Sequence, residues 1–347
     1  MTDEIGIDES DTSTDLISGA IDAISGTGIP EPIKRNLFKA LGKLCTAAVE
    51  IPVAYMEGVA LEKRAETAAR IKLIEKSSKE IAQQMSFDQE YAKAAVKKFG
   101  QRVIREQVNL DIIAEQAADK LAAETKNIDQ KPTDTCAEIN DDWLNVFEKE
   151  ASQKSTEEMQ SMFASILAGE IRRPNTFSIK SVRLLGSLDK QTANLFKRVC
   201  SMCIFLGYQI EGIEHIIDAR IPSLDRSPSS NGLSEFGLTF DSLNLLQEYG
   251  LIIPEYNSWM DYTAALGNKD RPIALPFEFG GEKWGLIEQE GFPGNDLKIS
   301  GISLTRSGRE LMRVVRTNAD PRFSTALTAW FESKKVRMVR VSYKPAG

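Results

Sequence analysis

The stretch from Glu31 to about Glu124 most constrains the fold, because helical patterning runs along it with little interruption. Pro32 stands where the first turn of a helix tolerates proline, and strong helix formers dominate after Lys63. Pro52 removes a helical donor and predicts a kink or break within the stretch. The N-terminal third is therefore expected to consist of long amphipathic helices.

The first of these helices carries an apolar stripe. Its members, Leu37, Leu41 and Leu44, recur at three- and four-residue steps and so share one face. A face this apolar needs a partner surface, and we expect it to mediate homo-oligomer formation.

A second apolar feature overlaps its end. Leu44 to Leu61 is a run of 18 residues that is apolar apart from Thr46, Glu50 and Glu57. This length is near the minimum for a membrane span, but two glutamates make insertion costly. Two interpretations stay open: a core helix of a soluble bundle, or a helix that enters a membrane on activation. In the second case the outward face would hold Val49, Val53, Met56 and Ala60.

Composition divides the chain into segments. The polar stretch around Pro132 has the chemistry of a connecting loop. We expect an acidic flexible tail (1–30), long amphipathic helices (31–125), a linker (126–140), a helical core domain (141–207), a winged-helix-like domain (208–320) and a basic C-terminal segment (321–347).

The helical core domain is delimited by capping signals. Ser155 and Glu158 have the spacing of a capping box, which predicts a helix to about Ala168 that Gly169 closes. Ser178 is expected to cap the next helix. Asp189 or Ser187 is expected to start another, which ends near Gly207.

The C-terminal half shows mixed signals. A helix is predicted over 239–249 with Gly250 as its stop, followed by a strand over 251–253. Gly280 and Gly281 indicate a hairpin, 299–304 a third strand, and Thr305 the cap of a helix through Arg316. The fold class expected is therefore mainly α, with a winged-helix-like α+β domain at the C-terminal end.

Several function classes lose their usual residues. His215 is the only histidine of the 347-residue chain, and it is expected in a short amphipathic helix as a structural residue. Cys200 and Cys203 lack further ligands nearby, which favours core cysteines over a zinc or redox site. Acid pairs at Asp141–Asp142 and Glu157–Glu158 are better explained by helix dipoles than by a metal. We expect no catalytic residue, metal, cofactor or small-molecule substrate.

The segment from Asp142 to about Leu206 carries a resemblance. Asp142-Trp143, the run Ile166-Leu167-Ala168-Gly169-Glu170-Ile171, and Phe177-Ser178 resemble a bacterial family known as domain of unknown function 2806, and more loosely the abortive-infection alpha proteins of phage defence. The resemblance implies a role in antiviral defence and supplies no catalytic residues. Its positions are expected to be structural, namely Trp143, Phe147, Glu158, Leu167, Gly169, Glu170 and Ile171.

Three functions follow as hypotheses. The first is a non-enzymatic defence or regulatory protein that acts through contacts with a protein partner or with itself, with the N-terminal helices as effector segment. It is expected in the reducing cytoplasm, associated with a membrane when active. The alternative is a DNA-associated winged-helix regulator. The third is a nuclease or hydrolase that uses the clustered acids.

The charge pattern bears on the alternative. The helix predicted over 239–249 holds Asp241 and Glu248 but no Lys or Arg, so it is poorly suited to the major groove. The bases that remain for a nucleic-acid backbone or an acidic partner lie later, at Arg309, Arg313, Arg316, Lys335, Arg337 and Arg340.

We therefore predict no sequence-specific DNA binding, and at most weak binding that fades as salt rises. A gel-shift titration across salt concentrations measures this. A specific site that survives physiological salt would contradict the prediction.

Overall fold

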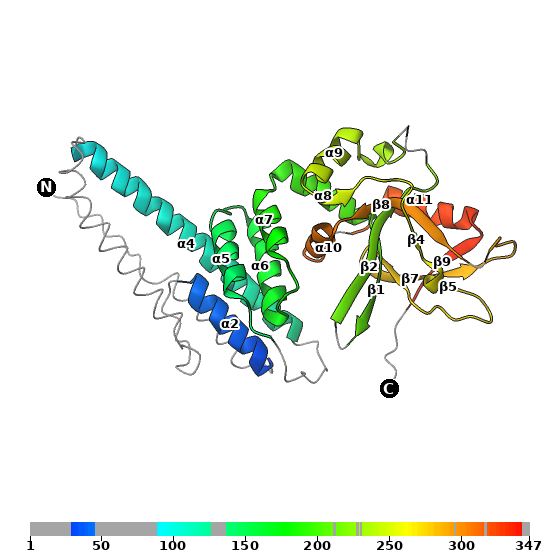
Figure 1. The fold of residues 1–347 in the computed structure, drawn as a ribbon, viewed down its shortest axis with the longest axis horizontal. Helices are drawn as coiled ribbons and strands as arrows, with labels where there is room; N and C mark the ends of the chain where they lie inside the picture. The colour runs from blue at the N-terminus through cyan, green and yellow to red at the C-terminus, as the bar shows by residue number, and fades with distance from the viewer. Residues whose placement is uncertain are drawn as a thin grey trace. The chain divides into compact units, whose positions relative to one another are not determined.

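The computed structural model describes residues 29–45, 89–125, 137–210, 213–226, 229, 231–294, 296–315 and 318–341. The chain divides into two compact units, Met1–Gly186 and Ser187–Gly347. The described part of the first is helical, and the second is built around a sheet (Figure 1).

The first unit is a helical bundle. Asn140 begins one of its helices, because its side-chain oxygen accepts a hydrogen bond from the backbone N–H of Trp143. The described helices are α2 (Glu31–Leu44), α4 (Gln89–Thr125), α5 (Asp141–Ala151), α6 (Glu157–Arg172) and α7 (Ile179–Ser187).

The apolar stripe of α2 is buried inside this unit. Leu37, Leu41 and Leu44 are at most 2% exposed, and α2 contacts α4, α5 and α6. Each such leucine contributes about 1.5–3 kcal/mol on burial. The stripe therefore has its partner surface within the chain and does not need a second subunit to be buried.

The proposed membrane face falls elsewhere. Val49, Val53, Met56 and Ala60 lie outside the described residues. Within the ranges that the structure describes, no helix has both the length and the apolar character needed to cross a membrane.

The second unit is built around a mainly antiparallel sheet of nine strands in the described part. The main path runs β3-β8-β2-β1-β6-β7-β5, with β4 paired to β8 and β9 to β7; β5 pairs with β7 in parallel. The strands are β1 (Ile204–Ile210), β2 (Ile213–Pro222), β3 (Ile252–Ile253), β4 (Trp259–Asp261), β5 (Leu266–Gly267), β6 (Phe277–Phe279), β7 (Glu282–Glu288), β8 (Lys298–Leu304) and β9 (Val336–Arg340).

Helices accompany this sheet. Phe323, Leu327 and Phe331 of α11 are buried, and α11 contacts β9. The helical segments are α8 (Lys190–Met202), α9 (Phe240–Glu248), α10 (Arg306–Met312), α11 (Pro321–Ser333) and the short turns η3 (Ser234–Phe236) and η4 (Thr263–Ala265).

The predicted fold class is wrong, because the chain is α+β rather than mainly α. A winged helix was expected to account for the C-terminal half, but a nine-stranded sheet occupies that part of the described chain. Two errors explain the difference. The helix expected to end near Gly207 ends at Met202, and the segment around His215 belongs to strand β2. The basic C-terminal segment forms α11 and β9.

Several local predictions are confirmed. Thr239 caps α9, and β3 begins at Ile252, two residues after Gly250. Gly280 and Gly281, at φ 61° and 80°, join β6 to β7 in the left-handed conformation that a tight hairpin needs. Thr305 caps α10 by accepting a hydrogen bond from the N–H of Gly308, although the helix ends at Met312 rather than Arg316.

Two helix boundaries differ from the prediction. Helix α6 begins at Glu157 after Thr156, and no side-chain capping bond is formed there. It continues through Gly169 to Arg172, so Gly169 lies inside the helix.

One of the two predicted starts of α8 is confirmed. Asp189 begins this helix, since its carboxylate accepts a hydrogen bond from the backbone N–H of Thr192.

A buried ion pair lies among the central strands. The Nη2 atom of Arg220 lies 2.9 Å from Oδ1 of Asp218, Nε of Arg220 also bonds this carboxylate, and both residues are 3% exposed. Nη1 of Arg220 donates to the carbonyls of Ser258 and Ile299, each at 2.9 Å. The Tyr262 hydroxyl donates to Asp218 at 3.0 Å. These bonds tie β2 to β8 and to the residue before β4.

Removing one partner of this pair is expected to destabilise the second unit strongly. Asp218→Ala leaves a guanidinium without its counter-ion in the interior, which costs about 3–5 kcal/mol. Chemical denaturation followed by the tryptophan fluorescence measures the loss. The double variant Asp218→Ala/Arg220→Met should recover part of it, and a Asp218→Ala protein as stable as the wild type would contradict the role assigned to the pair.

Candidate functional site

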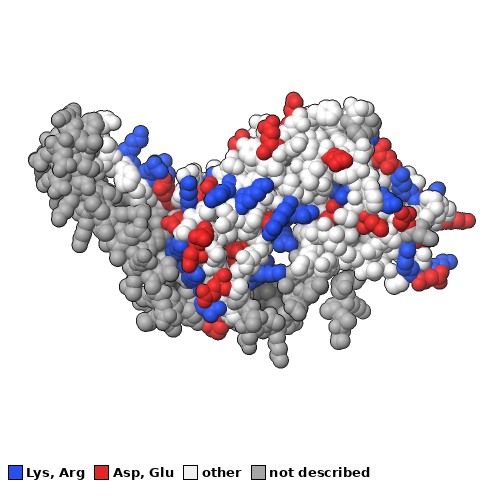
Figure 2. All heavy atoms as spheres, in the orientation of Figure 1, with Lys and Arg blue, Asp and Glu red and all other residues white. Residues whose placement is uncertain are grey.

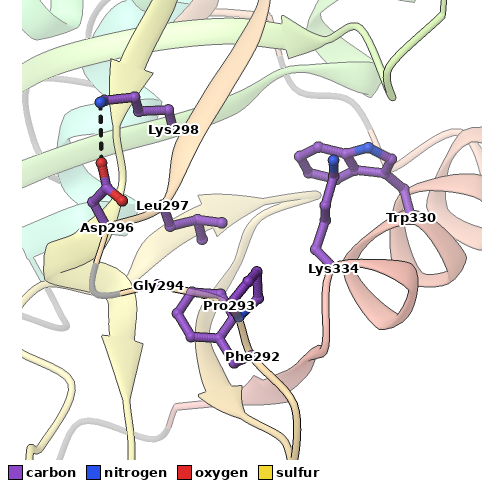
Figure 3. Close-up of a pocket in the computed structure, with 8 residues that line it drawn as sticks. All are labelled: Phe292, Pro293, Gly294, Asp296, Leu297, Lys298, Trp330 and Lys334. Atoms are coloured by element: carbon purple, nitrogen blue, oxygen red, sulfur yellow. Dashed lines mark ion pairs between the residues drawn. The ribbon is translucent and has the colours of Figure 1, made fainter.

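The second unit contains an open pocket of about 310 Å³. Trp330 of α11 and Lys334, just after that helix, form one side. The loop from β7 to β8 forms the other side with Phe292 and Leu297, and their side chains and the indole appear together in Figure 3. The remaining lining residues are Pro293, Gly294, Asp296 and Lys298.

The pocket's walls are fixed to the sheet. The backbone N–H of Leu297 donates to the Thr263 hydroxyl at 2.9 Å, and its carbonyl accepts from Tyr262 N–H at 2.7 Å. Trp330 is 9% exposed and contacts Phe331, with 4.9 Å between their ring centroids. The apolar floor is therefore largely formed before any ligand arrives.

Both lysines at the rim are paired with carboxylates. Nζ of Lys298 lies 3.0 Å from Asp296 Oδ2, and Nζ of Lys334 lies 2.6 Å from Asp225 Oδ2. The hydrogen bond and charge of Lys298 lower the pKa of Asp296 below its ordinary value. Two positive and two negative groups leave the rim near electrical neutrality, which gives a free anion little reason to enter.

A solvent-exposed tryptophan lies outside the pocket lining and is connected to it through Lys298. Trp259 on β4 is 55% exposed, and Nζ of Lys298 lies 4.9 Å from the centre of its ring. Lys334 lies in the same way over Trp330, at 5.8 Å. Tryptophan is enriched at the energetically dominant positions of protein interfaces. An apolar floor with a ring of paired charges suits an apolar side chain of a protein partner.

The sequence alone does not single out this pocket. Phe292 and Trp330 are far apart in the chain, and only the fold brings their segments together. The aromatic pair Trp330-Phe331 was the available signal, because it stands in the segment that was described only by its basic charge.

The family-motif residues meet at one turn of the first unit. Both carboxylate oxygens of Glu170 accept backbone N–H bonds from the loop after α6, from Asn175 at 2.6 Å and Phe177 at 2.9 Å. The Trp143 indole donates to the Phe177 carbonyl at 2.8 Å. A Cβ atom on Gly169 would lie 2.7 Å from the Phe177 ring, so the motif's glycine leaves room for that ring.

The other motif positions pack or face solvent. Phe147 stacks on Trp143 with ring centroids 5.1 Å apart and meets Phe163 edge to face at 5.6 Å. Leu167 and Ile171 are buried, whereas Glu158 is exposed in the first turn of α6. These contacts explain the motif as packing and loop closure.

Apart from the neighbouring Cys200 and Cys203, the remaining titratable candidates do not form a cluster in the described part of the chain. His215 is exposed on β2 and stacks on Tyr208, with 5.2 Å between the rings. Burial raises the pKa of the Cys203 thiol well above its ordinary value and that of Cys200 likewise. Asp141 pairs with Lys39 at 3.1 Å. In the described ranges no group of three or more His, Cys, Asp or Glu side chains is placed to hold a metal ion.

The candidate basic contacts are split between two parts of the sheet. Arg309 and Arg313 follow β8, whereas Lys335, Arg337 and Arg340 belong to the region of β9, which pairs with β7. Three strands separate β8 from β7, and Arg316 lies outside the described residues. Arg340 pairs with Glu282 at 3.0 Å, and Figure 2 shows acidic and basic side chains mixed on its visible face.

Loss of the Glu170 carboxylate is expected to loosen the turn after α6. Glu170→Ala removes the acceptor of two backbone N–H groups, and we expect the free energy of unfolding to fall by about 2–4 kcal/mol. Glu170→Gln keeps one oxygen and should lose less. Equal stability of both variants and the wild type in urea titrations would show that the turn does not depend on this side chain.

Comparison with known proteins supports the motif assignment. A family model described as "Protein of unknown function (DUF2806)" matches residues 94–328, which is more than half of the chain. No curated protein and no solved structure gives a match. The match spans the turn that Glu170 closes, the whole path from α8 to α10 and most of α11. The chain therefore belongs to the DUF2806 family.

Proposed function

We propose that this chain is a non-enzymatic protein that acts by binding another protein through the pocket between α11 and the β7–β8 loop. The exposed indole of Trp259, which lies against the Lys298 side chain that lines this pocket, carries the proposal. A partner that buried the exposed apolar surface of this indole would gain about 25 cal/mol of binding free energy per Å². The ammonium group of Lys298, which lies over this ring, would remain at the solvent-exposed rim of the interface.

The pocket suits one inserted side chain of the partner. Its floor is apolar at Trp330, Phe292 and Leu297, and the charged groups of Lys298 and Lys334 stand around it. Because both lysines already have acidic partners, binding energy would come mainly from the apolar contact, and the charges would select orientation.

A role in defence or in regulation fits a binding protein of this kind. The defence role rests on the resemblance of residues 142–206 to abortive-infection alpha proteins and is a proposal. The same proposal places the protein in the cytoplasm and has it associate with a membrane on activation.

Photo-crosslinking in producing cells tests the pocket. A benzophenone amino acid in place of Trp259 should form one discrete adduct with a protein partner, whereas the same group at exposed Asp241 should not. Adding Trp330→Ala should reduce the adduct at least about tenfold, because the floor of the pocket is lost. In the same strains, phage plating should be reduced by the wild type and restored by Trp259→Ala if the contact serves defence.

Two outcomes would contradict the proposal. One is the same adducts at positions 259 and 241, which would mean collision rather than a site. The other is an adduct at 259 that Trp330→Ala leaves unchanged while circular dichroism shows the variant folded.

A further inference from the structure

Helix α4 exposes several apolar side chains in its N-terminal half, and two of them lie on one stripe. Phe99 is 50% exposed and Val103 is 43% exposed. They precede buried Leu110 by eleven and seven residues, which are close to whole numbers of helical turns. The exposed residues therefore continue the same stripe that forms the core of the bundle further along the helix.

The buried part of the stripe shows what such a face is made to contact. Leu110, Ile113, Ala117 and Leu121 are at most 3% exposed, and α4 contacts α6, α5 and α2. The Gln107 side chain donates to the carbonyl of Leu44 at 2.9 Å, so α2 ends beside this point of α4. Among the described residues, helices cover the stripe from about Gln107 onward, and Phe99 and Val103 before that point are exposed.

The exposed half of the stripe is bordered by bases. Lys98, Arg102 and Arg105 are exposed and lie along one side of it. Arg102 also bonds Glu106, with Nε 2.7 Å from Oε1. From Gln89 to Gln107 the sequence has five bases against two acids, a balance of +3. Acidic side chains on a partner would complement this border.

The shape of the unit narrows the choice of partner. Because the bundle helices pack on the same side of α4, a flat lipid surface laid against Phe99 would collide with them. A second copy would bring one basic border against another, which is unfavourable. A single helix about 10 Å wide, placed in line with the bundle, fits both limits.

We propose that the N-terminal half of α4 binds an amphipathic helix of another protein, whose apolar stripe meets Phe99 and Val103 and whose acidic residues face Lys98, Arg102 and Arg105. This contact is independent of the pocket in the second unit. The two can fail separately.

The experiment uses the full chain and two synthetic probes. Each probe is a labelled helical peptide of about three heptads with leucine at its core positions; one carries glutamate elsewhere and the other lysine. We expect the acidic peptide to bind at least about tenfold more tightly than its basic twin at low salt, and this preference to shrink as salt rises. Fluorescence anisotropy measures both.

Matched variants locate the binding. Phe99→Glu/Val103→Glu should weaken the acidic peptide at least about tenfold. Ile104→Glu/Val108→Glu adds the same charge at exposed apolar positions on the opposite side of α4 and should weaken it much less. Lys98→Gln/Arg105→Gln should remove most of the salt dependence. Circular dichroism should show unchanged helix content, because all these side chains are exposed.

Each other result overturns the proposal. Equal affinity for both peptides would rule out an acidic helix as the partner. An equal loss of affinity in the stripe variant and its control would do the same. A wild-type dimer that Phe99→Glu/Val103→Glu dissociates in sedimentation equilibrium would assign the stripe to a second copy. Binding to phosphatidylserine vesicles without peptide binding would assign it to lipid. A monomer that binds neither peptide nor vesicle would mean that the stripe is covered within the chain.

Discussion

The ion pair between Asp218 and Arg220 sets the geometry of the second unit. A charge in the interior is tolerated only where its partner and its remaining hydrogen-bond donors are satisfied, and this pair meets that condition through Tyr262 and the carbonyls of Ser258 and Ile299. These contacts come from β2, β8 and the residues on either side of β4. A shift in strand register would break several of them at once, so the pair acts against alternative pairings.

The pocket depends on the same contacts. Tyr262 donates its backbone N–H to Leu297, one residue before β8, while its hydroxyl holds Asp218. Burial, together with the charge of Asp218, raises the pKa of the Tyr262 hydroxyl well above its ordinary value. The phenol therefore keeps its proton and remains a donor at neutral and moderately alkaline pH. The loop that carries Phe292 thus ends at β8, a strand whose register a buried network fixes.

The sequence predicted those parts of the fold that local chemistry decides. Thr239 and Gly250 delimit α9, and the Gly280-Gly281 pair makes the hairpin, because each residue acts on its own backbone. Strands β1 and β2 were missed since short apolar runs do not distinguish a buried strand from a helix. The motif positions were expected to be structural, and their meeting at the Phe177 turn could not be seen without the fold. The pocket was missed for the same reason.

The exposed half of α4 owes its helical conformation to the bundle into which it continues. Short isolated helices are marginally stable in water. Here the exposed half continues into helical turns of α4 that the buried Leu110 and Ile113 fix in the bundle. Nucleation is therefore supplied by the bundle, and the Arg102–Glu106 pair adds a favourable contact between successive turns. A partner would meet a helix that is already formed, so little of its binding free energy would be lost in ordering α4. The core of the bundle and the binding capacity of its extension are in this way two parts of one apolar stripe.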